Sequence, residues 1–289
     1  ELVESYDDHF SKELNQVKLH EGQNIIASEM RNILQSSKLI KKRAEHLYNN
    51  HVEVGIIKDK VQEYYSLRCV PQVLGPVYET LKNVEKVLVN EVNSVNDNPI
   101  IDKENIDVFH GGNFHGDYVS LEMDKLKIVI TKLTMLVERQ LNYIYNNKLN
   151  EKFPPFANLG VVGLDLGLQA AQFTATSTTA ECQTLSNPMY IHSIPNNGDN
   201  QDIVSMGTNA ALMTKKVIEN SFQVLAINYL SLLQVIDFMG FNDKLSETGK
   251  DIYNKLRAIV PKIIKDEPLY HHIENIKQYL IQNQPNILK

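Results

Sequence analysis

Residues 164–185 read LDLGLQAAQFTATSTTAECQTL, and this stretch decides the fold class. Its apolar and small residues recur at alternating spacings of four and three, which places them on one face of an α-helix. This face comprises Leu164, Leu168, Ala171, Ala175, Thr178, Cys182 and Leu185. Because most of these side chains are small, neighbouring helices can approach closely, so we predict a helix at the centre of a bundle.

Helical spacing also dominates the rest of the chain. Apolar positions from Leu126 to Ile144 fall on one face of a long amphipathic helix, and residues 217–239 are apolar nearly all round, as in a second central helix. Pro71 suits the first turn of another helix, which runs to about Val92. Alternating strand-like runs with hairpin turns are almost absent, so we predict an all-α fold, an elongated bundle of long helices.

Polar connections separate the predicted helices. They are rich in Asn, Gly and Pro, as turns are, and comprise residues 94–99 (SVNDNP), 110–116 (HGGNFHG), 151–156 (EKFPPF) and 193–202 (SIPNNGDNQD). The absence of a repeat or a flexible linker predicts a single helical domain over residues 1–289, with a peripheral helical tail at 243–289. The sequence begins in mid-pattern, with no turn signal before Glu1, so we expect the C-terminal portion of a longer protein.

The composition is typical of a globular protein. The chain has 289 residues, 43% hydrophobic and 22% charged, and its net charge of −6 shows no basic footprint for nucleic acid. Two cysteines are too few for a disulfide framework, although a single bridge is possible, and this favours the cytoplasm. Asn228, Gln234 and Asp237 interrupt the most apolar stretch, which predicts a buried helix and no membrane span.

The segment VQEYYSLRCVPQ, residues 61–72, contains the most informative single charge. Arg68 follows Tyr65 by three residues in surroundings apolar enough to be buried, and a buried guanidinium needs an anion or several acceptors. A planar carboxylate is its natural partner because it accepts two parallel hydrogen bonds. The residues alone favour a structural ion pair with Asp or Glu and leave a bound carboxylate as the alternative.

Other motifs exclude several kinds of site. His110 and His115 do not have the spacing of zinc ligands on a helix, and no Cys/His cluster supports a metal. The chain has no G-x-S-x-G, G-x-G-x-x-G or G-x-x-x-x-G-K-[ST], which argues against a serine nucleophile and a nucleotide site. In NNGDNQD, residues 196–202, Asp199 or Asn200 is expected to cap the following helix, with a polar pocket as the alternative.

Taken in order, several segments resemble one enzyme family. They are QEYYSLRCVPQVLGP (62–76), NSVNDNPIID (93–102), FHGGNFHGD (109–117), FPPF (153–156) and SNPMYIHSIPNNGDNQDIVSMG (186–207). Together they resemble the C-terminal half of the aromatic amino acid ammonia-lyases, which include histidine, phenylalanine and tyrosine ammonia-lyases. The resemblance runs from about Glu1 to Phe241 and is greatest to bacterial tyrosine ammonia-lyases.

The resemblance implies an elongated bundle of the ammonia-lyase/fumarase-like superfamily that assembles as a homotetramer, each active site being built from three subunits. It implies elimination of ammonia from a small-molecule amino acid to give an α,β-unsaturated acid. The cofactor that it implies is methylidene-imidazolone (MIO), an electrophile made from an internal Ala-Ser-Gly, with no metal or nucleotide.

The resemblance also assigns roles to individual residues. Arg68 would hold the substrate carboxylate, and Tyr65 would lie near the reacting carbons and handle protons. Phe114 would pack against the electrophile, which Asn200 and Gln201 would orient together with the substrate. The remaining pocket residues that it implies are Gln62, Asn98, Gln169 and Asn197.

The chain departs from the family pattern in three places. No glycine follows a serine, so Ala-Ser-Gly is absent and the chain alone is expected to be inactive. Gln169 and Asn197 stand where plant phenylalanine lyases have lysine and glutamate. Residues 200–204 read NQDIV where histidine lyases usually read NQEDH, which favours an aromatic substrate.

The sequence therefore predicts a tyrosine or general aromatic amino acid ammonia-lyase, with p-coumarate as the favoured product. Histidine ammonia-lyase, which forms urocanate, and an aminomutase with the same machinery are enzymatic alternatives. A non-catalytic helical assembly module is the alternative of another class. The helices around Ala171 and Leu225 are apolar on more faces than one subunit easily buries, so we expect them to contact partner subunits.

Overall fold

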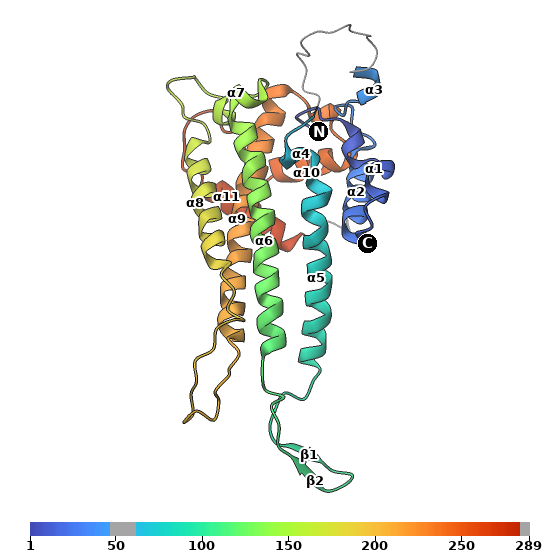
Figure 1. The fold of residues 1–289 in the computed structure, drawn as a ribbon. Coiled ribbons are helices and arrows are strands. Elements are labelled where there is room, and N and C mark those ends of the chain that lie inside the picture. The colour runs from blue at the N-terminus through green and yellow to red at the C-terminus, as the bar shows by residue number, and fades with distance from the viewer. Residues whose placement is uncertain (47–61, 284–289) are drawn as a thin grey trace.

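The computed structural model describes residues 1–46 and 62–283 (Figure 1). Its regular elements in chain order are η1 (Asp7–Phe10), α1 (Lys12–Gln16), α2 (Glu21–Leu34), α3 (Arg43–His46), α4 (Tyr65–Arg68), α5 (Val70–Val92), β1 (Ile100–Asp102), β2 (Asp107–Phe109), α6 (Asp117–Tyr145), α7 (Asn147–Asn150), η2 (Pro155–Ala157), α8 (Gln169–Leu185), α9 (Gly207–Met239), η3 (Asn242–Lys244), α10 (Glu247–Arg257) and α11 (Tyr270–Gln282). The predicted all-α fold is confirmed.

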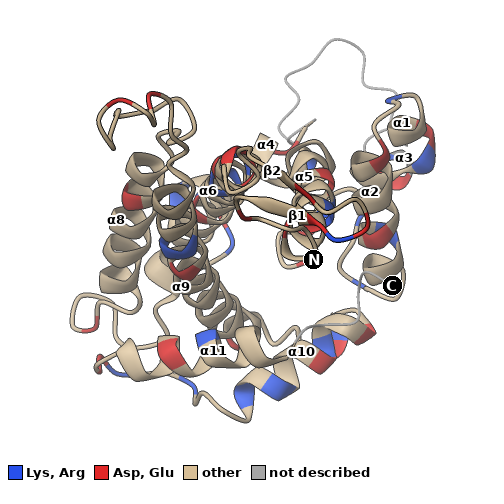
Figure 2. Ribbon diagram, turned by 90° about the horizontal axis from the view of Figure 1, so that it is seen from below, with Lys and Arg blue, Asp and Glu red and all other residues tan. Residues whose placement is uncertain are grey.

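Four long helices, α5, α6, α8 and α9, form an elongated bundle (Figure 1). The helix α6 packs against α5, α8 and α9, while α2 packs against α5 on the outside. The predicted start of α5 near Pro71 and its end at Val92 agree with the structure. Figure 2 shows acidic and basic residues interspersed over the helices.

The helix α8 buries the face that its sequence predicts, with two adjustments. It begins at Gln169, because residues 161–167 form a turn in which Gly167 has a φ of +62°. Thr179 is buried where the pattern placed Thr178, since a real helix has 3.6 residues per turn. Ala171 itself is buried within this chain, whereas the contact of these helices with partner subunits stays a prediction. The opposite face of α8 exposes the large apolar side chain of Phe173.

The helix α9 forms the centre of the largest core cluster. By length and composition it could cross a membrane, but 56% of its most apolar stretch is buried inside the protein, as in a bundle core. Leu256, Val260 and Ile276, from the segment after Asn242, are fully buried in the same cluster. That segment therefore contributes to the main core.

One short hairpin interrupts the helical architecture. Strands β1 and β2 pair antiparallel, with Ile101 opposite Val108, and project from the end of α5 (Figure 1). Asp102 organises their turn, because its Oδ1 accepts hydrogen bonds from the backbone N–H of Glu104 at 2.9 Å and of Asn105 at 3.3 Å. The sequence did not predict this hairpin, since three-residue strands have no readable period.

Candidate functional site

The segment that contains Arg68 is a single helical turn, α4, attached to the long helix α6. Gln140 of α6 donates a hydrogen bond from Nε2 to the Ser66 carbonyl at 2.7 Å. The Tyr64 ring meets the Tyr143 ring edge to face, with centroids 5.5 Å apart. These two contacts fix α4 against the end of α6 (Figure 1).

The Arg68 guanidinium is held by neutral groups. Its Nε donates to the Glu63 backbone carbonyl at 3.0 Å, and its central carbon lies 4.6 Å from the centroid of the Tyr65 ring. Within residues 1–46 and 62–283, no carboxylate forms an ion pair with Arg68. The structural ion pair that the residues alone favoured is therefore wrong for the described part of the chain.

Arg68 lines an open cleft of about 510 Å³. Its other lining residues include Gln62 and Tyr65, as expected, together with Arg139, Asn142 and Tyr143 of α6. Burial raises the pKa of Tyr143 to about 12, with a further contribution from Glu63, so this phenol stays protonated at neutral pH. Sequence reasoning missed the α6 residues because they belong to an otherwise ordinary amphipathic helix.

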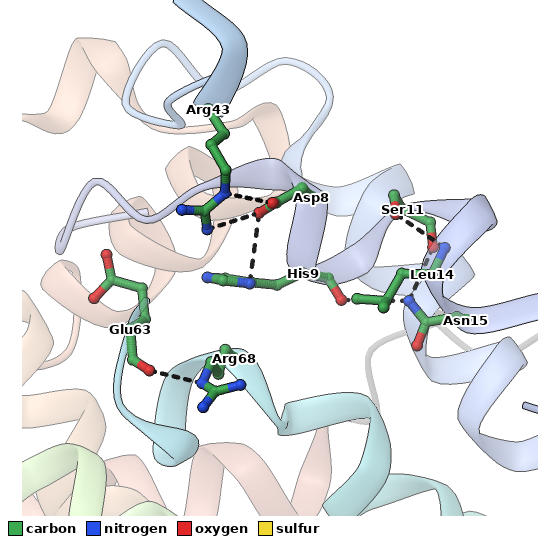
Figure 3. Close-up of polar contacts among 8 residues, drawn as sticks. All are labelled: Asp8, His9, Ser11, Leu14, Asn15, Arg43, Glu63 and Arg68. Atoms are coloured by element: carbon green, nitrogen blue, oxygen red, sulfur yellow. Dashed lines mark hydrogen bonds and ion pairs between the residues drawn. The ribbon is translucent and has the colours of Figure 1, made fainter. Parts of the chain in front are cut away.

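A buried histidine lies beside Arg68. Figure 3 shows the His9 ring between Arg68 and the ion pair in which Arg43 Nε approaches Asp8 Oδ2 to 2.5 Å. Burial lowers the pKa of His9, and Arg43 and Arg68 lower it further while Asp8 opposes them. A neutral His9 adds no positive charge next to Arg68. No sequence signal connected these positions, which come from separate segments.

A second group of predicted site residues gathers at the opposite end of the bundle. Asn98 Oδ1 accepts a hydrogen bond from the Gly111 backbone N–H at 2.7 Å, which ties the two ends of the hairpin segment together. Phe114 follows in the same segment and is 54% exposed. His115 Nε2 lies 3.3 Å from the Ile203 carbonyl, so this segment contacts the loop between α8 and α9.

The loop between α8 and α9 contains the remaining predicted residues. Asn196 and Gln201 exchange backbone hydrogen bonds of 3.1 and 3.3 Å, which closes a tight turn at the loop tip. Asn197 and Asp199 have positive φ values of 52° and 64° in this turn, as Asn and Asp tolerate better than most residues. The helix α9 begins only at Gly207, so the expected cap by Asp199 or Asn200 is wrong.

The two groups cannot meet within one chain. Arg68 immediately precedes α5 and Asn98 lies just beyond its end, and a helix of 23 residues spans about 35 Å. Gln169 starts α8 at the same end of the bundle as α4, whereas Phe114, Asn200 and Gln201 lie at the other end (Figure 1). The structure thus places the predicted residues in two separate groups, one at each end of the bundle. We refer to the group at the α4 end as the upper half-site (Gln62, Tyr65, Arg68 and Gln169) and to the group at the hairpin end as the lower half-site (Asn98, Phe114, Asn197, Asn200 and Gln201).

The lower half-site has chemistry suited to holding an MIO group. Asn200 and Gln201 offer amide N–H donors to a carbonyl oxygen, and the exposed Phe114 ring offers a flat apolar surface. The sequence contains no Ser-Gly, so the Ala-Ser-Gly from which the resemblance derives this group is absent from it. In the described ranges no three His, Cys, Asp or Glu side chains gather as metal ligands would.

Comparison with known proteins gives a consistent result. The family model for aromatic amino acid lyases matches residues 1–258. The chain is 37% identical over 271 residues to an MIO-dependent tyrosine 2,3-aminomutase from Streptomyces globisporus, covering 92% of this chain and 50% of that protein. It is 36% identical to a tyrosine ammonia-lyase from Cupriavidus metallidurans, with coverages of 92% and 50%. It is 35% identical to a histidine ammonia-lyase from Caldanaerobacter subterraneus, with coverages of 93% and 49%.

The three-dimensional fold matches in the same way. The structure superposes on that of Pantoea agglomerans phenylalanine aminomutase with a TM-score of 0.91 and 34% identity, covering 97% of this chain and 55% of the other. The chain thus spans about half the length of the relatives that it matches. A family match over nearly the whole chain, together with the same helical bundle, shows that the chain belongs to the aromatic amino acid lyase family.

Proposed function

We propose that the chain forms the C-terminal part of an enzyme that eliminates ammonia from an aromatic L-amino acid. Tyrosine is the favoured substrate and p-coumarate the product. The observation that carries the proposal is Arg68, which lines a cleft beside Tyr65 and pairs with no carboxylate in the described residues. A substrate carboxylate satisfies such a guanidinium through two parallel hydrogen bonds.

In the upper half-site, each residue has a distinct task. Arg68 donates N–H hydrogen bonds to the substrate carboxylate and thereby fixes the α-carbon in place. The Tyr65 phenol, stacked under that guanidinium, exchanges a proton at its oxygen near the reacting carbons. Gln62 and Gln169 supply amide groups at the same end of the bundle, where they contact the substrate.

In the lower half-site, polar and aromatic side chains face the electrophile. When bound, the MIO group supplies the electrophilic centre that activates the substrate for loss of ammonia. Asn200 and Gln201 donate amide hydrogen bonds that orient it, and Phe114 excludes water from one of its faces. Asn98 and Asn197 supply further amide groups on the polar side of the lower half-site. The name of the MIO-dependent relative supports this cofactor.

A complete site then requires several subunits. Because the two half-sites lie about 35 Å apart along α5, one chain cannot supply both to one substrate molecule. We propose a cytoplasmic homotetramer with shared active sites, in which half-sites of different subunits meet. Exposed Phe114 and Phe173 suit such contacts, and the unbridged Cys69 and Cys182 suit a reducing compartment.

The test is an assay of the longer polypeptide that contains both this chain and an Ala-Ser-Gly segment. Tyrosine, phenylalanine and histidine are supplied separately, and absorbance of the unsaturated acid is followed. We expect turnover of tyrosine above that of histidine. Absence of turnover of all three amino acids would contradict the proposal and favour the non-catalytic assembly module.

A tyrosine 2,3-aminomutase is the second candidate, because a relative of that name is 37% identical. The two activities share their substrate and differ in product. Mass spectrometry with chiral chromatography separates p-coumarate from β-tyrosine in the same reaction. Urocanate from histidine as the main product would instead favour histidine ammonia-lyase, which the match to that relative also supports.

A further inference from the structure

The loop of residues 186–206 contains three predicted site residues but has little support of its own. Its tip, with Asn197, Asn200 and Gln201, is exposed or half-buried and is closed by backbone bonds within the tip itself, between Asn196 and Gln201 and from Asn200 to Asn197. A loop that orients a reacting group needs a fixed position, since a displacement of about 1 Å can reduce a rate about a hundredfold. Something outside the loop must therefore hold it.

Asp124 of α6 provides that support. Its Oδ2 accepts a hydrogen bond from the Tyr190 backbone N–H at 2.7 Å, and its side chain is almost fully buried. Among the residues that the structure describes, the other hydrogen bonds from this loop to neighbouring elements lie closer to its ends: Ser186 and Asn187 bond to α6 and α8 at one end, and the Ile203 carbonyl lies 3.3 Å from His115 Nε2 at the other. Met189, the neighbour of Tyr190, packs against the apolar cluster that contains Met123.

A buried lysine holds the Asp124 carboxylate in turn. Lys127 lies one turn further along α6 and is fully buried, and its Nζ approaches Asp124 Oδ1 to 2.7 Å as an ion pair. The Lys127 Nζ also lies 4.0 Å from Met213 Sδ. Two buried charges are tolerated only because they pair, so one carboxylate oxygen faces the lysine and the other stays directed at the loop.

We propose that Asp124 is a positioning residue for the lower half-site, with Lys127 as its counter-charge. Asp124 contacts no substrate. It fixes the loop backbone at Tyr190, and thereby the position of Asn200 and Gln201 along the axis of α6. This proposal rests on the proposed function, because it assigns Asp124 to the same site. Nothing in the motif pattern indicated it, since Asp124 and Lys127 resemble an ordinary i,i+3 surface pair.

The experiment compares two double variants of the full-length enzyme. Asp124→Leu with Lys127→Met replaces the ion pair by apolar side chains, a change that buried pairs often tolerate without loss of stability. Asp124→Asn with Lys127→Met removes the charges equally but retains an oxygen that can accept from Tyr190 N–H. The measurements are kcat, KM, and hydrogen exchange of the backbone amides in residues 186–206.

We expect the Leu/Met variant to lose about a hundredfold in kcat with little change in KM, because Arg68 at the other half-site is untouched. Its loop amides should exchange at least about tenfold faster, whereas the Asn/Met variant should resemble the wild type in both measurements. If the two variants have the same kcat and the same loop exchange rates, whether both are impaired or both resemble the wild type, the proposal is overturned. Exchange reports on the loop even if the wild type turns over no amino acid, so failure of the proposed function is recognised separately.

Discussion

Arg68 shows what a single residue and its surroundings can establish. Its motif indicated a need for an anion, but only the three-dimensional structure shows that no described carboxylate satisfies it. Partner choice depends on which segments meet in space, and a local sequence contains no such information. The same limit applies to His9, which no motif connects to Arg68 (Figure 3).

We predict that Arg68→Ala raises KM for tyrosine steeply in the full-length enzyme. Loss of a hydrogen-bonded pair with a bound carboxylate costs about 2 kcal/mol or more, equivalent to about thirtyfold in KM. Arg68→Lys keeps the charge but loses the planar fork, so its KM should lie between those of the wild type and the alanine variant. An unchanged KM in the alanine variant would remove Arg68 from carboxylate binding.

His9 predicts a pH effect on stability. Burial lowers its pKa in the folded state, so the unfolded chain binds the extra proton more readily and stability falls as the pH drops through the unfolded value of about 6.5. The thermal midpoint should therefore fall between about pH 7 and pH 5, and His9→Gln should reduce this slope. His20 is exposed, and His20→Gln should leave the slope as it is in the wild type.

At the scale of whole elements, local signals predicted the four long helices α5, α6, α8 and α9 well and the contacts between helices poorly. Pro71 and the polar segment after Val92 mark the ends of α5 because both act on the neighbouring backbone alone. No sequence signal singled out Gly75 within α5. In the structure it is the point at which α2 crosses α5 in direct backbone contact.

We predict that Gly75→Ala destabilises the packing of α2 on α5. A Cβ at Gly75 would lie 2.6 Å from the Gln23 backbone nitrogen, and one at the facing Gly22 would lie 2.4 Å from the Gly75 carbonyl oxygen. The helices must separate, which typically costs about 1–3 kcal/mol in the free energy of unfolding. Chemical denaturation measures the change. Gly112→Ala is the control, because its added Cβ meets no atom within 4 Å, and an equal loss in both variants would exclude the crossing as the cause.

At the scale of the whole molecule, the division of the site into two half-sites follows from the length of α5. The sequence motifs named the site residues in order but contained no statement about the distances between them. The 23 residues of α5 place them about 35 Å apart (Figure 1). If each site is shared between subunits, mixing differently damaged subunits can restore activity, which it cannot do for a site within one chain.

We predict that two impaired variants recover activity when their subunits are mixed. Arg68→Ala damages only the upper half-site and Gln201→Ala only the lower, so a site that takes each half from a different subunit can draw both from undamaged copies. Random assortment in an equal mixture leaves about a quarter of the sites intact.

The subunits of the two variants are denatured together and refolded, and the activity of the mixture is compared with that of each variant treated alone. Arg68→Ala mixed with Tyr65→Phe is the control, because both changes lie in α4 and every site receives one of them. Recovery in the first mixture alone supports sites shared between chains, whereas activity no higher than the sum of the separate variants would place each site within a single chain.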